Sequence, residues 1–140
     1  MIVTTVLSLG LVMLSVLIHY EALHVTNALL PRQEDHNRSR ILVAFTGVLC
    51  AHLLSVLIFA ATYAYISSIR SLGALAGKLE GGFSDFVYFS LMSFTTLGVG
   101  DIYATGPMRI IAGFQALNGF VLIGWSASFA YVVMQKTDTS

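Results

Sequence analysis

The sequence predicts an all-α integral membrane protein, with three transmembrane helices and a shorter helix that enters the membrane without crossing it. Composition is the first observation: 56% of the 140 residues are hydrophobic and 10% are charged, whereas soluble chains carry about 25% charged residues. Three long apolar stretches are the second observation, and a short apolar stretch followed by a glycine-rich segment is the third. With a mean hydropathy of +0.82, we expect a lipid bilayer as the surroundings, no enzymatic activity and no nucleic-acid partner.

The first apolar stretch predicts an N-terminal transmembrane helix. It runs from Ile2 to Leu30 and carries no charged residue before Glu21, and a spanning helix needs about 20 apolar residues. Pro31 ends the stretch, because a proline disfavours the helical conformation of the residue before it. We therefore assign residues 1–40 to one transmembrane helix and the loop that follows it.

Two further stretches are long enough to span a membrane as helices. They predict helices over residues 41–68 and 107–134. The remainder of the chain, residues 41–140, thus forms a second unit with a pair of spanning helices.

A shorter apolar segment lies between these two helices. Gly81 and Gly82 break the preceding structure, and Ser84 is a residue type that caps a helix N-terminus. A helix over residues 84–95 reaches only about halfway across a bilayer at about 1.5 Å per residue. Residues 96–101 then alternate glycine with apolar residues and favour extended chain. Such backbone is tolerated at membrane depth only where it is buried in protein or lines a water-filled path.

The segment reads Thr95-Thr96-Leu97-Gly98-Val99-Gly100-Asp101 and resembles the selectivity-filter signature of potassium channels, Thr-Val-Gly-Tyr-Gly-Asp. The likeness covers about residues 83–134 and includes the helices on either side. The chain therefore resembles the two-helix pore domain of the potassium-channel superfamily, with one extra N-terminal helix. The resemblance implies an outer helix, a pore helix, a filter and an inner helix at residues 41–68, 84–95, 96–101 and 107–134.

This resemblance implies passive potassium conduction through a ring of backbone carbonyls. Such a ring replaces the water shell of a cation, and its strands alternate between left- and right-handed dihedral angles, which Gly98 and Gly100 adopt at little cost. Because one chain supplies one filter strand, the resemblance implies a homotetramer with monovalent cations as ligands and no other cofactor. The potassium-binding groups would be the Thr96 hydroxyl and the carbonyls of Thr96, Leu97, Gly98 and Val99, with Gly100 completing the filter.

Two residues depart from the family pattern. Val99 stands where the family has an aromatic residue that props the filter, which leaves open a non-selective channel for sodium and potassium. Met92 stands where some members have a glutamate that pairs with the filter aspartate, so we expect Asp101 to lack that partner and to hold water or an external cation. By resemblance, Thr95 and Tyr88 support the filter together with Met92 and Asp101.

The inner helix carries the expected gating residues. Gly119 matches a hinge glycine, and its alternative role is close helix packing. By resemblance, Phe120, Ala127 and Tyr131 face the conduction path, with Tyr131 near an inner gate or, alternatively, acting as an interfacial anchor. Pore loops of the family enter from outside, which implies a multi-pass protein of the cell membrane with its N-terminus outside and its C-terminus in the cytoplasm.

Polar residues of the first helix leave four interpretations open. His19, Tyr20, Glu21 and His24 lie toward its second end, where they could sense pH, since histidine titrates near neutrality. Alternatively they form a polar helix end or a link to His52 in the second helix. Histidines on two helices can also ligate haem, so a haem-binding membrane anchor is a competing function.

Overall fold

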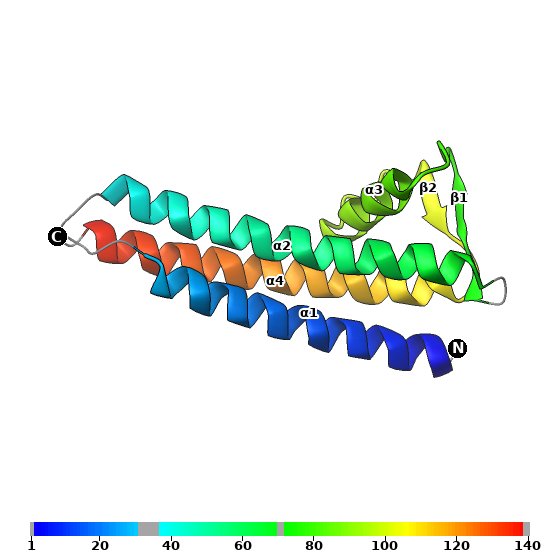
Figure 1. The fold of residues 1–140 in the computed structure, drawn as a ribbon, viewed down its shortest axis with the longest axis horizontal. Helices are drawn as coiled ribbons and strands as arrows, with labels where there is room; N and C mark the ends of the chain where they lie inside the picture. The colour runs from blue at the N-terminus through cyan, green and yellow to red at the C-terminus, as the bar shows by residue number, and fades with distance from the viewer. Residues whose placement is uncertain (1, 31–36, 70–71, 139–140) are drawn as a thin grey trace.

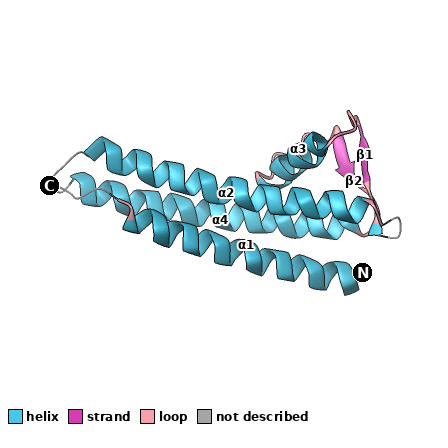
Figure 2. Cartoon of the chain, in the orientation of Figure 1, coloured by secondary structure: helices cyan, strands magenta, loops and turns pink. Residues whose placement is uncertain are grey.

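A computed structural model describes residues 2–30, 37–69 and 72–138. Four helices and two short strands follow one another along the chain (Figures 1 and 2). Three of the helices are long and apolar enough to cross a membrane, which confirms the predicted fold class. In chain order the elements are α1 (Ile2–Ala28), α2 (Asn37–Ser67), β1 (Leu75–Gly77), α3 (Phe83–Phe94), β2 (Ile102–Ala104) and α4 (Met108–Asp138).

The three long helices lie side by side, and α3 and the strands cover one end of this bundle (Figure 1). The start of α1 lies at the same end as α3, and the end of α4 lies at the opposite end. Two of the spanning helices extend further than predicted, since α2 begins at Asn37 and α4 continues to Asp138, whereas α1 ends at Ala28. Most of the predicted loop after α1, residues 31–36, lies outside the described residues.

The short helix begins one residue before its predicted start, and Ser84 is not its cap. Gly82 occupies the N-cap position with φ −145° and ψ 175°, and no side chain bonds there as a cap. Asp85 instead accepts a hydrogen bond of 2.8 Å from the Gly81 amide. This bond holds the pKa of Asp85 below its ordinary value, and a carboxylate is also favoured in the positive first turn of a helix.

A two-stranded antiparallel sheet adds to the all-helical prediction. Leu75 pairs with Ala104 and Gly77 with Ile102. Gly77 has φ +114°, and a side chain there would collide with the Asp101 carbonyl. The strands are three residues long and rich in small residues, so they lack the alternating pattern from which strands are predicted.

A buried hydrogen-bonded chain joins α2, α3 and α4. The Tyr63 hydroxyl donates to Gln115 Oε1 at 2.6 Å, Gln115 Nε2 donates to Ser90 Oγ at 2.7 Å, and Ser90 Oγ donates to the Val56 carbonyl at 2.7 Å. Apolar side chains surround it, among them Phe59, Phe89, Met108 and Ile111. Because a bilayer core offers no water, these polar groups must be satisfied inside the protein.

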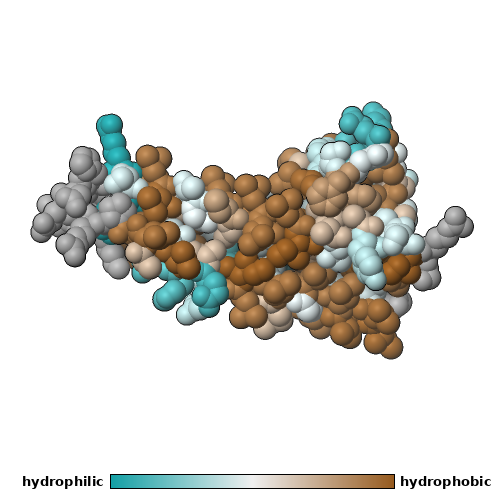
Figure 3. Space-filling view, viewed as in Figure 1, coloured by the Kyte–Doolittle hydropathy of each residue, from teal (hydrophilic) through white to brown (hydrophobic). Residues whose placement is uncertain are grey.

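The first helix turns small and polar side chains inward. Its buried residues are Thr4, Ser8, Leu11, Ser15, His19, Leu23 and Thr26, and α1 packs against both α2 and α4. Large apolar residues point outward, including Met13 and Leu17, which are 60% and 57% exposed. Figure 3 shows hydrophobic side chains over most of the visible surface, as a lipid-facing surface requires.

We predict that Tyr63→Phe destabilises the fold by about 1–2 kcal/mol, because Gln115 Oε1 loses its buried donor. Reversible unfolding in mixed micelles measures this change. Thr62→Val is the matched control, since Thr62 Oγ1 bonds only the Ile58 carbonyl one turn earlier in its own helix. Equal stability of the two variants would show that the buried chain does not hold α3 in place.

Candidate functional site

The chain reverses direction directly after α3. The amides of Thr95 and Thr96 donate to carbonyls of the last helical turn, and the Gly98 amide donates to the Met92 carbonyl at 3.3 Å. These bonds hold the segment that follows α3 against the C-terminal end of that helix. The Gly98 N–H therefore points back toward α3.

The backbone of this segment alternates in handedness. Gly98 and Gly100 have φ +55° and +88°, as the glycine spacing predicts, and Thr96 has φ +58°. The left-handed Thr96 was not predicted, because threonine carries no sequence signal for that conformation. A left-handed non-glycine residue costs about 1–3 kcal/mol, and such residues cluster at functional sites.

The same segment is not covered by its own chain. All residues from Thr95 to Gly100 are exposed, and the apolar side chains of Leu97 and Val99 are 66% and 59% exposed. Within a single chain these two side chains are therefore not buried in surrounding protein. Irregular backbone at membrane depth needs such cover or a water-filled path.

Asp101 is held on several sides at the end of the segment. The Tyr88 hydroxyl lies 3.1 and 3.0 Å from the two carboxylate oxygens, and the Ile102 amide donates to Oδ1 at 3.0 Å. The Asp101 carbonyl accepts from the Lys78 amide at 2.9 Å. Tyr88 on α3, and not the residue at position 92, supplies the partner of Asp101, a contact that the sequence did not predict.

The contact between Tyr88 and Asp101 also affects protonation. The hydrogen bond to the carboxylate raises the pKa of the Tyr88 phenol above its ordinary value, and the negative charge of Asp101 acts in the same direction. The neutral phenol is therefore favoured.

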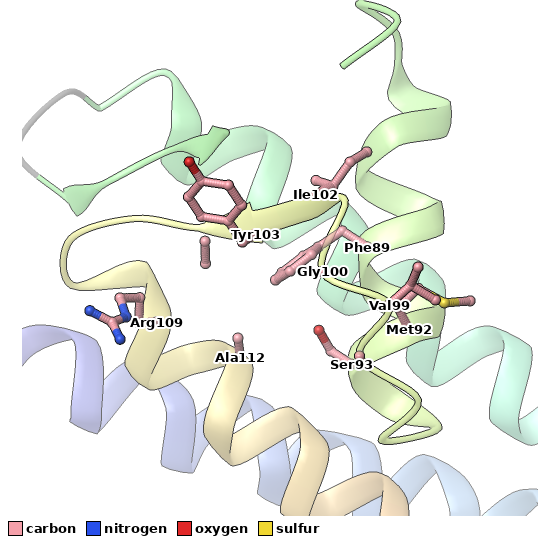
Figure 4. Close-up of a pocket in the computed structure, with 11 residues that line it drawn as sticks. Phe89, Met92, Ser93, Val99, Gly100, Ile102, Tyr103, Arg109 and Ala112 are labelled. Atoms are coloured by element: carbon pink, nitrogen blue, oxygen red, sulfur yellow. The ribbon is translucent and has the colours of Figure 1, made fainter. Parts of the chain in front are cut away.

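A pocket of about 300 Å³ lies beside Val99. Figure 4 shows Arg109 and Ala112, on α4, across the pocket from Val99 and Met92. Phe89, Ser93, Ile102 and Tyr103 are also among the lining residues. Val99, which replaces an aromatic residue of the family signature, therefore borders open space.

The residues of α4 that were predicted to take part in gating lie on two faces of the helix. Gly119 is buried, and an added β-carbon there would collide with the Phe94 carbonyl at the end of α3. Close packing against α3 thus requires a glycine at this position. Phe120 and Tyr131 are 69% and 61% exposed, and Ala127 is also exposed, so these three residues occupy a face that the chain itself does not cover.

Two of the predicted histidines meet inside the bundle. The rings of His19 and His52 stack with centroids 5.2 Å apart and an interplanar angle of 7°, whereas His24 is exposed. This stacking is the predicted link between α1 and α2, and it leaves no room for a porphyrin between the rings, which argues against the haem-binding alternative. No group of three His, Cys, Asp or Glu side chains that could hold a metal ion occurs in the described part of the chain.

A known protein family matches the part of the chain that contains residues 95–101. A family profile described as "Ion channel" matches residues 51–136, which is more than half of the chain. No curated protein and no solved structure matches the sequence. The matched range includes α3, the segment after it and most of α4, and it excludes α1.

We predict that Gly119→Ala destabilises the protein by about 1–3 kcal/mol, because the new methyl group overlaps the Phe94 carbonyl. Unfolding in mixed micelles measures this loss. Gly10→Ala is the control, since no atom lies within 4 Å of the corresponding position on α1. A neutral Gly119→Ala variant would contradict the close packing of α3 on α4.

We also predict that Asp101→Asn lowers the pKa of Tyr88, because the neutral amide removes the negative charge and accepts a weaker hydrogen bond from the phenol. In the wild type the bond is lost as pH rises through the raised pKa of Tyr88, since the phenolate has no proton to donate. Ultraviolet absorbance of tyrosinate reports the titration, with the Tyr88→Phe spectrum subtracted to isolate residue 88. An unchanged pKa in Asp101→Asn would argue that the two side chains do not bond in the membrane.

Proposed function

The chain belongs to the ion channel family through a two-helix, potassium-channel-like pore domain, and we propose that four copies conduct potassium passively across the cell membrane. In this proposal residues 96–101 form one strand of an axial filter. The Thr96 hydroxyl and the carbonyls of Thr96, Leu97, Gly98 and Val99 bind the ion, with Gly100 completing the strand.

The observation that carries the proposal is the alternating handedness of Thr96, Gly98 and Gly100. Alternation allows successive carbonyls to face one side of the strand, and a ring of carbonyls replaces the water shell of a cation. The hydrogen bond from the Gly98 amide to Met92 on α3 keeps that N–H away from the proposed ion path. In addition, α3 ends at the filter, where the negative end of its dipole favours a cation.

Exposure of the filter supports the assembly of several chains. A single chain leaves Leu97 and Val99 uncovered, together with Phe120 and Tyr131 on α4. Irregular backbone at membrane depth is not stable against lipid, which supports other copies as the cover of this site. Fourfold cyclic symmetry places four identical strands around one axis.

We attribute support of the filter to Asp101 and its neighbours. The Tyr88 hydroxyl and the Lys78 amide bind Asp101 from two directions, while Thr95 caps α3 and Met92 lies behind the strand. These contacts hold the outer end of the filter and replace the support that an aromatic ring at position 99 would give. A sodium- and potassium-conducting channel is the second candidate, because Val99 borders a pocket of about 300 Å³ into which the filter has room to move.

For gating, we propose that α4 lines the conduction path with Phe120, Ala127 and Tyr131 and bends near Gly119. Four Tyr131 side chains would narrow the exit, and apolar constrictions gate by dewetting. The proposed topology has α3 entering from outside, with the C-terminus in the cytoplasm. Three spanning helices then place the N-terminus outside.

We predict that Gly98→Ala and Gly100→Ala each abolish potassium flux from liposomes while the protein still assembles. An added β-carbon at a left-handed residue costs about 1–2 kcal/mol, and four subunits multiply this cost. Gly81→Ala is the matched control, because Gly81 has φ +88° with open space around it and lies outside the filter. Its flux is expected to equal that of the wild type.

Reversal potentials with potassium and sodium on opposite sides of the membrane test selectivity. A potassium preference in the wild type supports the main proposal, whereas equal permeability supports the second candidate. Normal flux through Gly98→Ala and Gly100→Ala would contradict the filter assignment, and a native mass other than that of a tetramer would contradict the assembly.

A further inference from the structure

The first helix has no part in the pore domain matched by the family, yet it makes hydrogen bonds to α4. Asn118 Nδ2 donates to Ser15 Oγ at 2.9 Å, and Ser126 Oγ lies 3.1 Å from His19 Nε2. The two contacts lie on either side of Gly119, where the proposed function places bending. A helix that served only as a membrane anchor would not need such contacts.

The second contact belongs to a layer of three polar side chains from three helices, which we call the histidine layer: His19 on α1, His52 on α2 and Ser126 on α4. Ser126 Oγ lies 3.0 Å from His52 Nε2 as well as 3.1 Å from His19 Nε2. A serine hydroxyl has one proton, so it donates to one ring and accepts from the other. Both bonds therefore form when the two rings are neutral and carry opposite protonation at Nε2.

The histidine layer is poorly suited to an extra proton. His19 is fully buried, and its Nδ1 has no hydrogen-bond partner among the described residues. A second proton on His19 would bury a charge, at high cost without a counter-charge. A second proton on whichever ring accepts from Ser126 would also place an N–H at both Nε2 atoms, so the Ser126 hydroxyl would lose its acceptor.

The layer also contacts the base of the proposed filter. The His52 ring lies 5.3 Å from the Phe94 ring at an angle of 54°, and Phe94 is the last residue of α3. The Phe94 carbonyl in turn packs on Gly119. A change in the layer therefore acts on α4 directly and on the end of α3 through one aromatic contact.

We propose that the histidine layer is a proton-sensitive contact through which α1 holds the C-terminal half of α4 in the closed position, and that its protonation releases α4. This inference rests on the proposed function, since release has a functional meaning only in a channel. It assigns to α1 a regulatory role in addition to membrane anchoring.

The groups around His19 determine the direction of the pH effect. On α2 the facing titratable group is His52, whereas α4 presents Trp125 and Ser126, and α3 contributes Phe94 through its contact with His52. On α1 itself Tyr20, Glu21 and His24 are exposed, and the Tyr20 ring lies 6.5 Å from that of Trp125. These contacts offer no carboxylate to the layer, so added positive charge separates the helices and acid should open the channel.

Single-channel recording in planar bilayers at pH 7.5 and pH 5.5 on both sides tests the proposal. We expect acid to raise wild-type open probability about fivefold or more, the change that corresponds to one hydrogen bond. His19→Gln keeps a polar amide in place of the ring and should lose most of this response, whereas His24→Gln, an exposed histidine on the same helix, should retain it. Ser126→Ala should be about fivefold more open at pH 7.5, with Ser128→Ala as control, because Ser128 Oγ bonds only the Gly124 carbonyl of its own helix.

A second measurement does not depend on conduction. Nitrogen-15 NMR of labelled histidine in bilayers should show opposite neutral tautomers for His19 and His52, assigned with the two His→Gln variants. Ser126→Cys, which retains volume and donates weakly, replaces Ser126→Ala if the latter does not fold. The proposal is overturned if the rings share one tautomer, if both Ser126 variants gate like Ser128→Ala, or if His24→Gln abolishes the acid response as His19→Gln does. If the wild-type protein conducts no ions but its two rings have opposite tautomers, the channel function is rejected together with the regulatory role that depends on it. The histidine layer is then only a structural contact.

Discussion

The absence of water from the bilayer core is the constraint on which this structure depends, because every polar group inside the membrane must find its partner within the protein. Side chains that would be solvated in a soluble protein are gathered here into buried layers. Tyr63 and Gln115 bind α3 to the two helices that flank it, and Ser90 completes their hydrogen bonds. These polar contacts and the apolar side chains around them position α3 and the segment that follows it.

The segment of residues 96–101 does not satisfy this constraint within one chain. Its backbone alternates in handedness and is exposed within one chain. Among the described residues it is held by the Met92 carbonyl, which accepts from the Gly98 amide, and at Asp101 by the Tyr88 hydroxyl and the Lys78 amide.

The sequence was sufficient to predict the spanning helices and the glycine-spaced segment, because hydropathy and the freedom of glycine are local properties. Contacts between distant residues were less predictable. Tyr88 and Asp101 are thirteen positions apart and meet only because the chain reverses after α3. Nor does the sequence decide between hinge and packing for Gly119, a choice that depends on where the Phe94 carbonyl lies. The strands β1 and β2 were missed, since three residues are too few for a recognisable pattern.

The pairing of β1 with β2 has a consequence for how this architecture can be divided. Gly77 and Ile102 are neighbours across the sheet. The intervening chain, which contains α3 and residues 96–101, therefore begins and ends at one place. Segments whose ends lie close together tolerate exchange and insertion. The stretch between these strands therefore forms a natural cassette, and chimaeras joined at Gly77 and Ile102 would exchange this stretch while leaving the three spanning helices intact.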